Sequence, residues 1–393
     1  MIKHYLKMIW KRRGKNAFLV AELILSFLVV FGVLAFAMKQ FQKLKIPEGF
    51  ITENIYNIYP SLNVDDLDSL EFKTKREQFK REILALEDIR NATFATEVTP
   101  YGNSNWSTGN GDGDENGFKY NTDYILCDQD FTDVWNTPIK EGNFFKEEDL
   151  VGKYVPIAVN QLFVDKFLKD TTALGFAFEM NGNDVIISGI FDHFKYQGKF
   201  GDETPMALVP ISTRWNNVGL LTVATHANAN EEIVKKMYDI TARITKNFDF
   251  WIEKVEVVRK KKNKAAWIPI IGLFSLAGFL LINISMGLFG ILRYNISRRK
   301  PEIGLRKAMG AHAGHIRSQF VGEMVILTSL AIIIGLIIAI QAPLLDVLQM
   351  ENLIYWKAIF LTLVIIYGIV IACSIIPSSQ AAAIEPAVSL HEE

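Results

Sequence analysis

The sequence predicts a membrane protein with four transmembrane α-helices and a large extracytoplasmic α+β domain of two lobes, inserted between helices 1 and 2. Four long apolar segments predict the helices, in a chain of 393 residues that is 50% hydrophobic. Charge is divided in the same way: residues 46–258 carry 35 acidic and 20 basic side chains (−15), the remainder carries 8 and 22 (+14), and together they give the net charge of −1. The acidic part is therefore expected to be a soluble domain, with room for two lobes.

Each of the four apolar segments is long enough to cross a bilayer. Residues 17–38 are apolar except for Glu22 and Ser26, and residues 267–292, 324–342 and 358–376 contain no ionisable side chain. A helix of about 20 residues spans the hydrocarbon core of roughly 30 Å. The first segment also exceeds the roughly 7–15 apolar residues of a signal-peptide core, so we expect an uncleaved anchor.

The basic residues near the helix ends predict the orientation. Residues 1–16 contain six Lys and Arg, and the loop between the second and third apolar segments contains seven. An excess of Lys and Arg marks cytoplasmic loops, so both termini and this loop are expected in the cytoplasm. The run Arg259–Lys264 lies on the opposite side, either at the outer headgroups or on a solvated stalk.

The expected organisation is a cytoplasmic N-terminal segment (1–16), transmembrane helix 1 (17–38), the extracytoplasmic domain (39–264), helix 2 (265–292), a cytoplasmic loop (293–319), helix 3 (320–342), a short outer loop (343–357), helix 4 (358–376) and a cytoplasmic tail (377–393). Within the outer domain, lobe one is expected at 46–100 plus 209–258, and an inserted lobe two at 101–208. Strand-like alternation predicts strands at 53–59, 93–99, 154–159, 184–191 and 248–258. Amphipathic periodicity predicts helices at 74–90 and from Asn230 to about Lys246.

The sequence offers little support for catalysis or metal binding. No phosphate-binding GxxxxGK[ST] run, GxSxG elbow or HExxH helix occurs in it. The spacing of Asp112, Asp114, Asn116, Gly117 and Asp123 resembles a calcium loop, but Asp replaces the usual Glu and a glycine-rich segment stands where a helix should enter. A polar hairpin tip is therefore favoured, and we expect no catalytic residue, cofactor site or metal site on this chain.

Three smaller features are interpreted structurally. Cys127 and Cys373 provide no disulfide framework. His312 and His315 have no further metal ligand nearby and are expected to lie on a basic helix. Glu22 is an intramembrane acid, which is a functional candidate by default, but its place near the cytoplasmic end favours pairing with Arg12, Arg13 or Lys15.

The loop between the second and third apolar segments is the most distinctive part of the sequence. Residues 299–311 read RKPEIGLRKAMGA, in which Pro301 and Glu302 suit the first turn of a short helix and Gly310 suits its end. Such a helix is either a lipid-headgroup anchor or a docking element for a soluble partner.

These residues resemble the FtsX-like permease family, which includes macrolide-exporter (MacB)-type and lipoprotein-releasing ABC transporter subunits. The match is strongest at 299–311 and continues at Ile316, Phe320 and Glu323. The tail 377–390 is similar to the family's closing motif but lacks its usual arginines. Looser matches in the outer domain lie at 141–145, 155–160, 173–175 and 186–190.

The resemblance implies a non-catalytic permease of a bacterial inner membrane, with ATP and Mg²⁺ bound by a separate ATPase chain. Two permease chains, identical or paralogous, would pair with two ATPase subunits, and the loop helix would dock on the ATPase. Membrane lipid and a periplasmic adaptor are further expected partners, whereas a near-neutral net charge gives no reason to expect nucleic acid. The residue match assigns ATPase coupling to Glu302, Ile303, Gly304, Arg306, Lys307, Met309 and Gly310.

Two functions remain open at this point. The first is ATP-driven movement of the outer domain, termed mechanotransmission, for export or extraction of lipid-like, peptide or drug cargo. The alternative is a membrane scaffold or sensor that transmits ATPase motion to a cell-envelope hydrolase or signalling partner.

Overall fold

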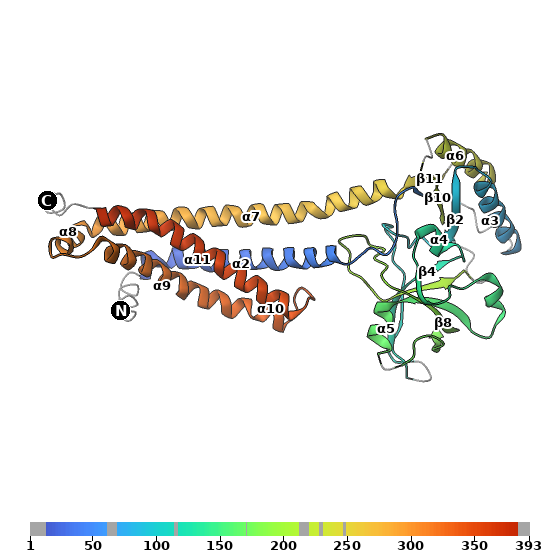
Figure 1. Ribbon diagram of the computed structural model, residues 1–393, viewed down its shortest axis with the longest axis horizontal. Coiled ribbons are helices and arrows are strands. Elements are labelled where there is room, and N and C mark those ends of the chain that lie inside the picture. Colours follow the sequence, from blue (N-terminus) through green and yellow to red (C-terminus); the bar gives the residue numbers. More distant parts are fainter. Residues whose placement is uncertain are drawn as a thin grey trace. The chain divides into compact units, whose positions relative to one another are not determined.

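The computed structural model describes residues 13–60, 69–113, 117–169, 171–211, 220–227, 231–246 and 249–383. The chain divides into two compact units (Figure 1). One consists of Met1–Gln42 with Trp267–Glu393, and the other is Lys43–Ala266. The second unit is thus an insertion into the first, as the apolar pattern predicts.

The first unit is helical. Its elements are α2 (Arg13–Lys45), α7 (Val255–Arg298), α8 (Lys300–Ala308), α9 (Ala313–Ala339), α10 (Gln341–Leu344) and α11 (Asn352–Ala383), of which α2 and α7 each run on into the second unit. Among the described residues, four helices are long and apolar enough to cross a membrane, namely those within Ala17–Lys45, Val255–Arg298, Ala313–Leu344 and Asn352–Ala383. A helix satisfies its own backbone hydrogen bonds, which hydrocarbon cannot do. The four predicted transmembrane helices are therefore confirmed.

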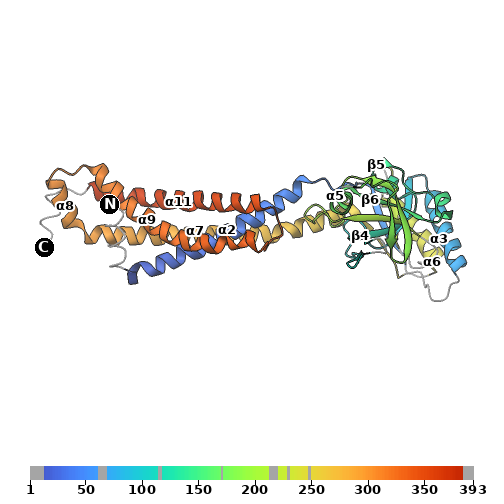
Figure 2. The same ribbon diagram turned by 90° about the horizontal axis from the view of Figure 1, so that it is seen from below.

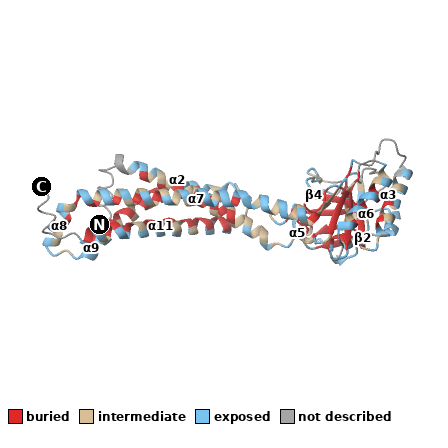
Figure 3. Cartoon of the chain, turned by 90° about the horizontal axis from the view of Figure 1, so that it is seen from above, coloured by how far each residue is buried: buried red, intermediate tan, exposed pale blue. Residues whose placement is uncertain are grey.

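One face of these helices forms a common core, drawn in red in Figure 3. Phe27 of α2 packs directly on Gly335 of α9, where an added Cβ would lie only 2.7 Å from the Phe27 ring. The opposite faces expose large apolar side chains such as Ile271, Phe279 and Ile282 of α7. An apolar exterior over an apolar core is the pattern of a helix that borders lipid or another membrane helix.

The second unit contains one mixed sheet. Its described strands are β1 (Ile55–Tyr59), β2 (Ile89–Ala95), β3 (Ser107–Asn110), β4 (Tyr120–Cys127), β5 (Ile139–Gly142), β6 (Val155–Asn160), β7 (Ala177–Met180), β8 (Asn183–Phe191), β9 (Met206–Pro210), β10 (Leu220–Thr225) and β11 (Trp251–Lys254). They pair in the order β11-β1-β10-β2-β4-β9-β6-β8-β5, while β3 pairs with β4 and β7 with β8. The remaining elements are α3 (Ser69–Leu84), α4 (Phe131–Trp135), the 3₁₀ helix η1 (Glu147–Val151), α5 (Gln161–Phe167) and α6 (Glu231–Thr245).

The two halves of this sheet each have an apolar core under their helices, and a third core spans both halves, with residues of β1, β2 and β10 beside residues of β4, β6 and β9. In one half α3 and α6 pack on β1, β10 and β2 through residues such as Phe79 and Met237, and in the other half α5 packs beside β6 through Phe163 (Figure 2). The halves meet where β2 and β4 share a single register pair, Ala95 with Cys127. The predicted α+β domain is therefore confirmed, although its two halves belong to one continuous sheet.

Some element boundaries differ from the sequence prediction. The helix expected to reach Arg90 ends at Leu84, because Ile89 and its neighbours pair with β10 as β2. The strand expected at 248–258 is confined to Trp251–Lys254, and the chain turns helical at Val255. Val255 is buried and Val258 packs against the same core, a spacing of three residues that suits a helix. β9 straddles the expected lobe boundary at 208/209 and pairs with β4 and β6.

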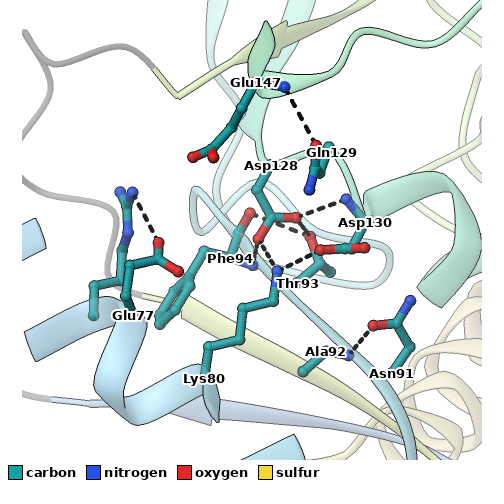
Figure 4. Close-up of polar contacts among 11 residues, drawn as sticks. Glu77, Lys80, Asn91, Ala92, Thr93, Phe94, Asp128, Gln129, Asp130 and Glu147 are labelled. Atoms are coloured by element: carbon teal, nitrogen blue, oxygen red, sulfur yellow. Dashed lines mark hydrogen bonds and ion pairs between the residues drawn. The ribbon is translucent and has the colours of Figure 1, made fainter. Parts of the chain in front are cut away.

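The Asp128 carboxylate adds a cluster of polar contacts at the seam between the two halves, beside the shared apolar core. Asp128 accepts hydrogen bonds from the Thr93 hydroxyl at 2.5 Å, the Phe94 amide at 3.0 Å and the Asp130 amide at 3.1 Å (Figure 4). Lys80 of α3 adds ion pairs to Asp128 at 2.7 Å and to Asp130 at 2.6 Å. Burial alone would lower the pKa of Lys80, but the two carboxylates outweigh it and raise that pKa above its ordinary value. The cluster thus joins α3, β2 and the β4–α4 turn where the strands barely pair.

We predict that Lys80→Met destabilises the outer domain by about 2 kcal/mol, because two largely buried carboxylates lose their cation. Urea unfolding of the purified chain in detergent, followed by tryptophan fluorescence, measures the change. Lys75→Met is the matched control, since within the described part of the chain Lys75 makes a surface i,i+4 pair with Glu71. Its loss should cost no more than about 0.5 kcal/mol. Equal shifts for the two variants would contradict a special role for the seam cluster.

Candidate coupling site

The predicted docking helix is present as α8. Pro301 lies in its first turn, where the missing backbone donor costs nothing, and Glu302 adds a negative charge at the same end. At its other end the Ala311 amide donates to the Arg306 carbonyl and the Gly310 amide to the Lys307 carbonyl, both at 3.0 Å. Gly310 has φ +92°, which a residue with a side chain rarely adopts. The sequence signals at both ends of this helix are therefore correct.

One face of α8 is buried inside the helical unit. Ile303 is 4% exposed and joins the core formed by α2, α7, α9 and α11, and Gly304 is buried beside it. The other face carries Leu305, which is 53% exposed, and Met309, which is 73% exposed. The apolar surface available to a partner is thus Leu305 and Met309, while Ile303 holds α8 against its own chain.

The two cations assigned to coupling are both held within the chain. Arg306 pairs with Glu302 at 2.5 Å and donates to the Gln319 side chain of α9 at 2.8 Å. The Lys307 ammonium donates to the Ala382 carbonyl near the end of α11 at 2.8 Å. Charge at these positions therefore fixes α8 to its two neighbouring helices.

A buried ion pair lies beneath α8. Arg299, between α7 and α8, donates to Glu323 of α9 at 2.8 Å, and the two side chains are only 9% and 7% exposed. The guanidinium also lies 5.9 Å from the centre of the Phe320 ring, and the Gln319 amide lies 3.5 Å from the Glu323 carboxylate. Removing either side chain of so buried a pair is costly, because the remaining side chain would be a buried charge without a partner.

Arg299 and Glu323 belong to the sequence motif, but the motif by itself gives them no role. A sequence signal for the pair was present, because Glu323 immediately precedes the apolar segment 324–342 and an acid at the border of a span requires a partner. The choice of partner was not accessible, since seven basic residues lie in the preceding loop. Only the packing of α8 selects Arg299.

Glu22, the acidic residue within the first predicted span, lies against a neighbouring helix. Glu22 is half-buried and points at α7, where its carboxylate lies 3.2 Å from the place a Cβ would occupy on Gly287. Its expected partners Arg12, Arg13 and Lys15 lie outside the described side chains. The partial burial of Glu22 and its approach to Gly287 place its carboxylate between α2 and α7 rather than toward lipid.

The calcium-like spacing falls on the β3–β4 hairpin, with Asp114 and Asn116 outside the described residues. Asp123 lies inside β4, where its carboxylate accepts hydrogen bonds from Tyr196 at 3.0 Å, Thr204 at 2.8 Å and Ser107. Asp123 therefore faces the loop after β8 rather than the hairpin tip.

The fold defines a multi-pass membrane protein with an inserted α+β domain and a short helix, α8, between two spans. Two family models match: "MacB-like periplasmic core domain" over residues 20–240 and "FtsX-like permease C-terminal" over residues 274–386. The chain belongs to the FtsX-like, MacB-type permease family, and it is an ABC transporter permease of that type.

Several relatives are similar over much of the chain. The ABC transporter permeases YvrN and YknZ of Bacillus subtilis (strain 168) are 24% and 23% identical, covering 68% and 67% of this chain and 69% and 68% of theirs. The macrolide export ATP-binding/permease protein MacB of Neisseria meningitidis serogroup A is 23% identical over 53% of this chain and 33% of its own length.

Solved structures show a weaker likeness. The periplasmic region of MacB from Actinobacillus actinomycetemcomitans is 14% identical, with a TM-score of 0.39, over 56% of this chain and 98% of that one. The extracellular domain of YknZ is 12% identical, with a TM-score of 0.35, over 51% and 100%. Likeness at this level adds nothing to the family assignment.

We predict that Arg299→Met and Glu323→Met each destabilise the helical unit by about 3 kcal/mol, because each leaves a buried charge alone, and that the double variant loses less than the sum. Thermal unfolding in detergent measures all three. Arg298→Met is the matched control, since its side chain is exposed and stacks on Tyr294. Additive losses in the double variant would show that the two side chains do not stabilise each other.

Proposed function

We propose that this chain is the permease subunit that couples ATP hydrolysis on a separate ATPase chain to movement of its outer domain. The observation that carries the proposal is the division of α8 into two faces. Leu305 and Met309 are exposed, while Ile303 and the neighbouring polar groups bind α8 to the membrane helices. A partner bound to the exposed face would displace α8, and the contacts of α8 with α9 and α11 would pass that displacement to both helices.

The packing beneath α8 supports such a transfer of force. Arg299 connects the end of α7 to α9, Lys307 connects α8 to the end of α11, and Arg306 connects α8 to α9. Protein interiors are close-packed and have low compressibility, so a displacement of α8 is passed on rather than absorbed. Helix α7 then continues to Val255 and contains Pro269, whose missing backbone donor removes one hydrogen bond of the helix.

The proposal includes the orientation that the basic residues predict. The N-terminus, the α8 loop and the C-terminus face the cytoplasm of a bacterial cell, and the acidic domain lies outside its inner membrane. ATP and Mg²⁺ bind the partner ATPase. A second permease chain, identical or paralogous, pairs through apolar faces such as that of α7, and lipid and a periplasmic adaptor complete the partners.

We favour export or extraction of lipid-like, peptide or drug cargo, because several relatives are named for macrolide export. The second candidate, a scaffold that acts on a cell-envelope hydrolase or signalling partner, uses the same α8 site. Vesicles that contain the permease and its ATPase distinguish them. Export predicts ATP-dependent loss of a fluorescent lipid, peptide or macrolide from the membrane, whereas a scaffold predicts none and a stable outer-domain complex instead.

We predict that Leu305→Asp and Met309→Asp each reduce copurification of the ATPase by about tenfold or more, because an unpaired carboxylate would have to be desolvated at the interface. Pull-down from cells that express both proteins measures the loss, with thermal unfolding to verify folding. Val151→Asp is the control, since Val151 is an apolar residue of the outer domain that is 90% exposed. Normal copurification and normal ATPase stimulation in both loop variants would exclude this face as the docking surface.

Charge reversal at Arg306 and Lys307 should behave differently from these two variants. Arg306→Glu and Lys307→Glu remove bonds to Gln319 and Ala382, so we expect a lower unfolding temperature as well as weaker coupling. The same unfolding and pull-down measurements separate the two effects. A loss of ATPase binding with an unchanged unfolding temperature would instead indicate that both cations contact the partner directly.

A further inference from the structure

Two helix ends enter the outer domain at the same place. The segment after α2 contacts the loop 96–106, which follows β2, and the loop 192–205, which joins β8 to β9. The first turns of α7 contact the loop 96–106 and the segment after α2. We name this set of contacts the base joint. All of its residues belong to the unit Lys43–Ala266.

Lys195 is the centre of the contact to α2. The residue is 1% exposed, and its ammonium donates to the Lys43 carbonyl in the last turn of α2 and to the Lys199 carbonyl, both at 2.8 Å. Its backbone amide donates to the Glu48 carbonyl at 2.9 Å, and burial lowers the pKa of its side chain. The carboxylates of Glu48, Glu203 and Asp202 favour its charged form, but none of the described carboxylates pairs directly with the ammonium. A lysine buried to this extent is therefore held in place chiefly by the two carbonyls.

The backbone at Gly49 lies so close to His193 that no side chain fits between them. Gly49 has φ +81°, and a Cβ added there would lie 1.7 Å from the His193 carbonyl oxygen. The segment after α2 therefore lies directly on the loop 192–205. Lys43 adds an ion pair to Asp202 of the same loop at 2.8 Å.

Glu48 links the two helix ends to each other. Its carboxylate accepts a hydrogen bond from the Tyr101 hydroxyl and pairs with Arg259 of α7 at 3.1 Å. Burial and the Glu48 carboxylate raise the pKa of Tyr101 to about 12, so the phenol remains a donor near neutral pH. Lys262 of α7 donates to the Gly102 carbonyl at 2.6 Å.

The loop 192–205 leads from this joint to the middle of the sheet. Tyr196 and Thr204 of the loop both donate to Asp123 of β4, at 3.0 and 2.8 Å. The loop then continues as β9, which pairs with β4 in parallel. Continuous contacts therefore run from the end of α2 to the strand that borders the seam.

We propose that Lys195 is a positioning residue that couples the end of α2 to the loop 192–205, so that displacement of the helix ends is transmitted to the seam of the outer sheet. The proposal deepens the function proposed above and rests on it. Lys195 acts through the Lys43 and Lys199 carbonyls, and Glu48 ties α7 into the same joint.

Hydrogen exchange by mass spectrometry tests the joint on the complete permease with its copurified ATPase, compared without nucleotide and with ATP plus orthovanadate. In the wild-type chain we expect nucleotide-dependent changes both in α8–α9 and in the loops 96–106 and 192–205. In Lys195→Met the change in α8–α9 should persist, while the change in the two loops falls to less than half. A purely structural role would alter loop exchange equally in both nucleotide states and leave the difference intact.

Lys199→Met is the matched control, because the exposed Lys199 contributes backbone groups to the joint, its carbonyl to Lys195 and its amide to the Tyr101 hydroxyl. The substitution keeps both groups and should behave like the wild type. Glu48→Gln, which keeps the size and an acceptor for Tyr101, covers the case in which Lys195→Met does not fold and should show the same loss. If the nucleotide-dependent change in the two loops is unaltered in Lys195→Met, the proposed role of the base joint is wrong while the proposed function stands. Glu48→Gln decides in the same way where Lys195→Met does not fold. A wild-type complex that shows no nucleotide-dependent change in α8–α9 would overturn the proposed function, and the joint with it.

Discussion

The absence of hydrogen-bond partners in a bilayer's hydrocarbon core is the constraint on which the organisation of this chain depends. Every backbone group there must be satisfied within its own segment, so the apolar stretches can cross only as helices. Charged side chains are consequently concentrated outside the spans, and the chain separates into an acidic insertion and a basic remainder. The few ionisable side chains that approach the helical core, such as Arg299 and Glu323, need a partner inside the protein.

Helix α7 connects two sites built on the same principle. At its first turns Arg259 and Lys262 bind the base joint of the outer domain, and just beyond its last turn Arg299 binds Glu323. Each anchor couples the helix to neighbours through a directed, largely desolvated polar contact. Hydrogen bonds weaken steeply when their geometry is distorted, so such contacts fix the relative positions of the elements that they join. Apolar contacts alone slide more readily, and they make up most of the surface between these anchors.

Much of the fold was accessible from the sequence because it depends on local patterns. The lengths of the apolar segments predicted the four spans, and Pro301 and Gly310 predicted the two ends of α8. The boundaries that failed are those that tertiary pairing decides. Ile89 continues the helical periodicity of α3, yet its pairing with β10 draws it into β2. Val255 and Val258 read equally well as strand or helix, and the core beside them selects the helix.

By itself the sequence determined the membrane helices, the inserted α+β domain and the family, since span length, charge distribution and a contiguous motif are properties of neighbouring residues. Only the tertiary structure decided which loop residues face outward and which are held inside, because burial depends on elements distant in sequence. Ile303 and Met309 are both apolar residues of the motif, but Ile303 is buried on the inner face of α8 and Met309 is exposed. Lys195 carries no sequence signal, since its partners are backbone carbonyls, which every residue possesses.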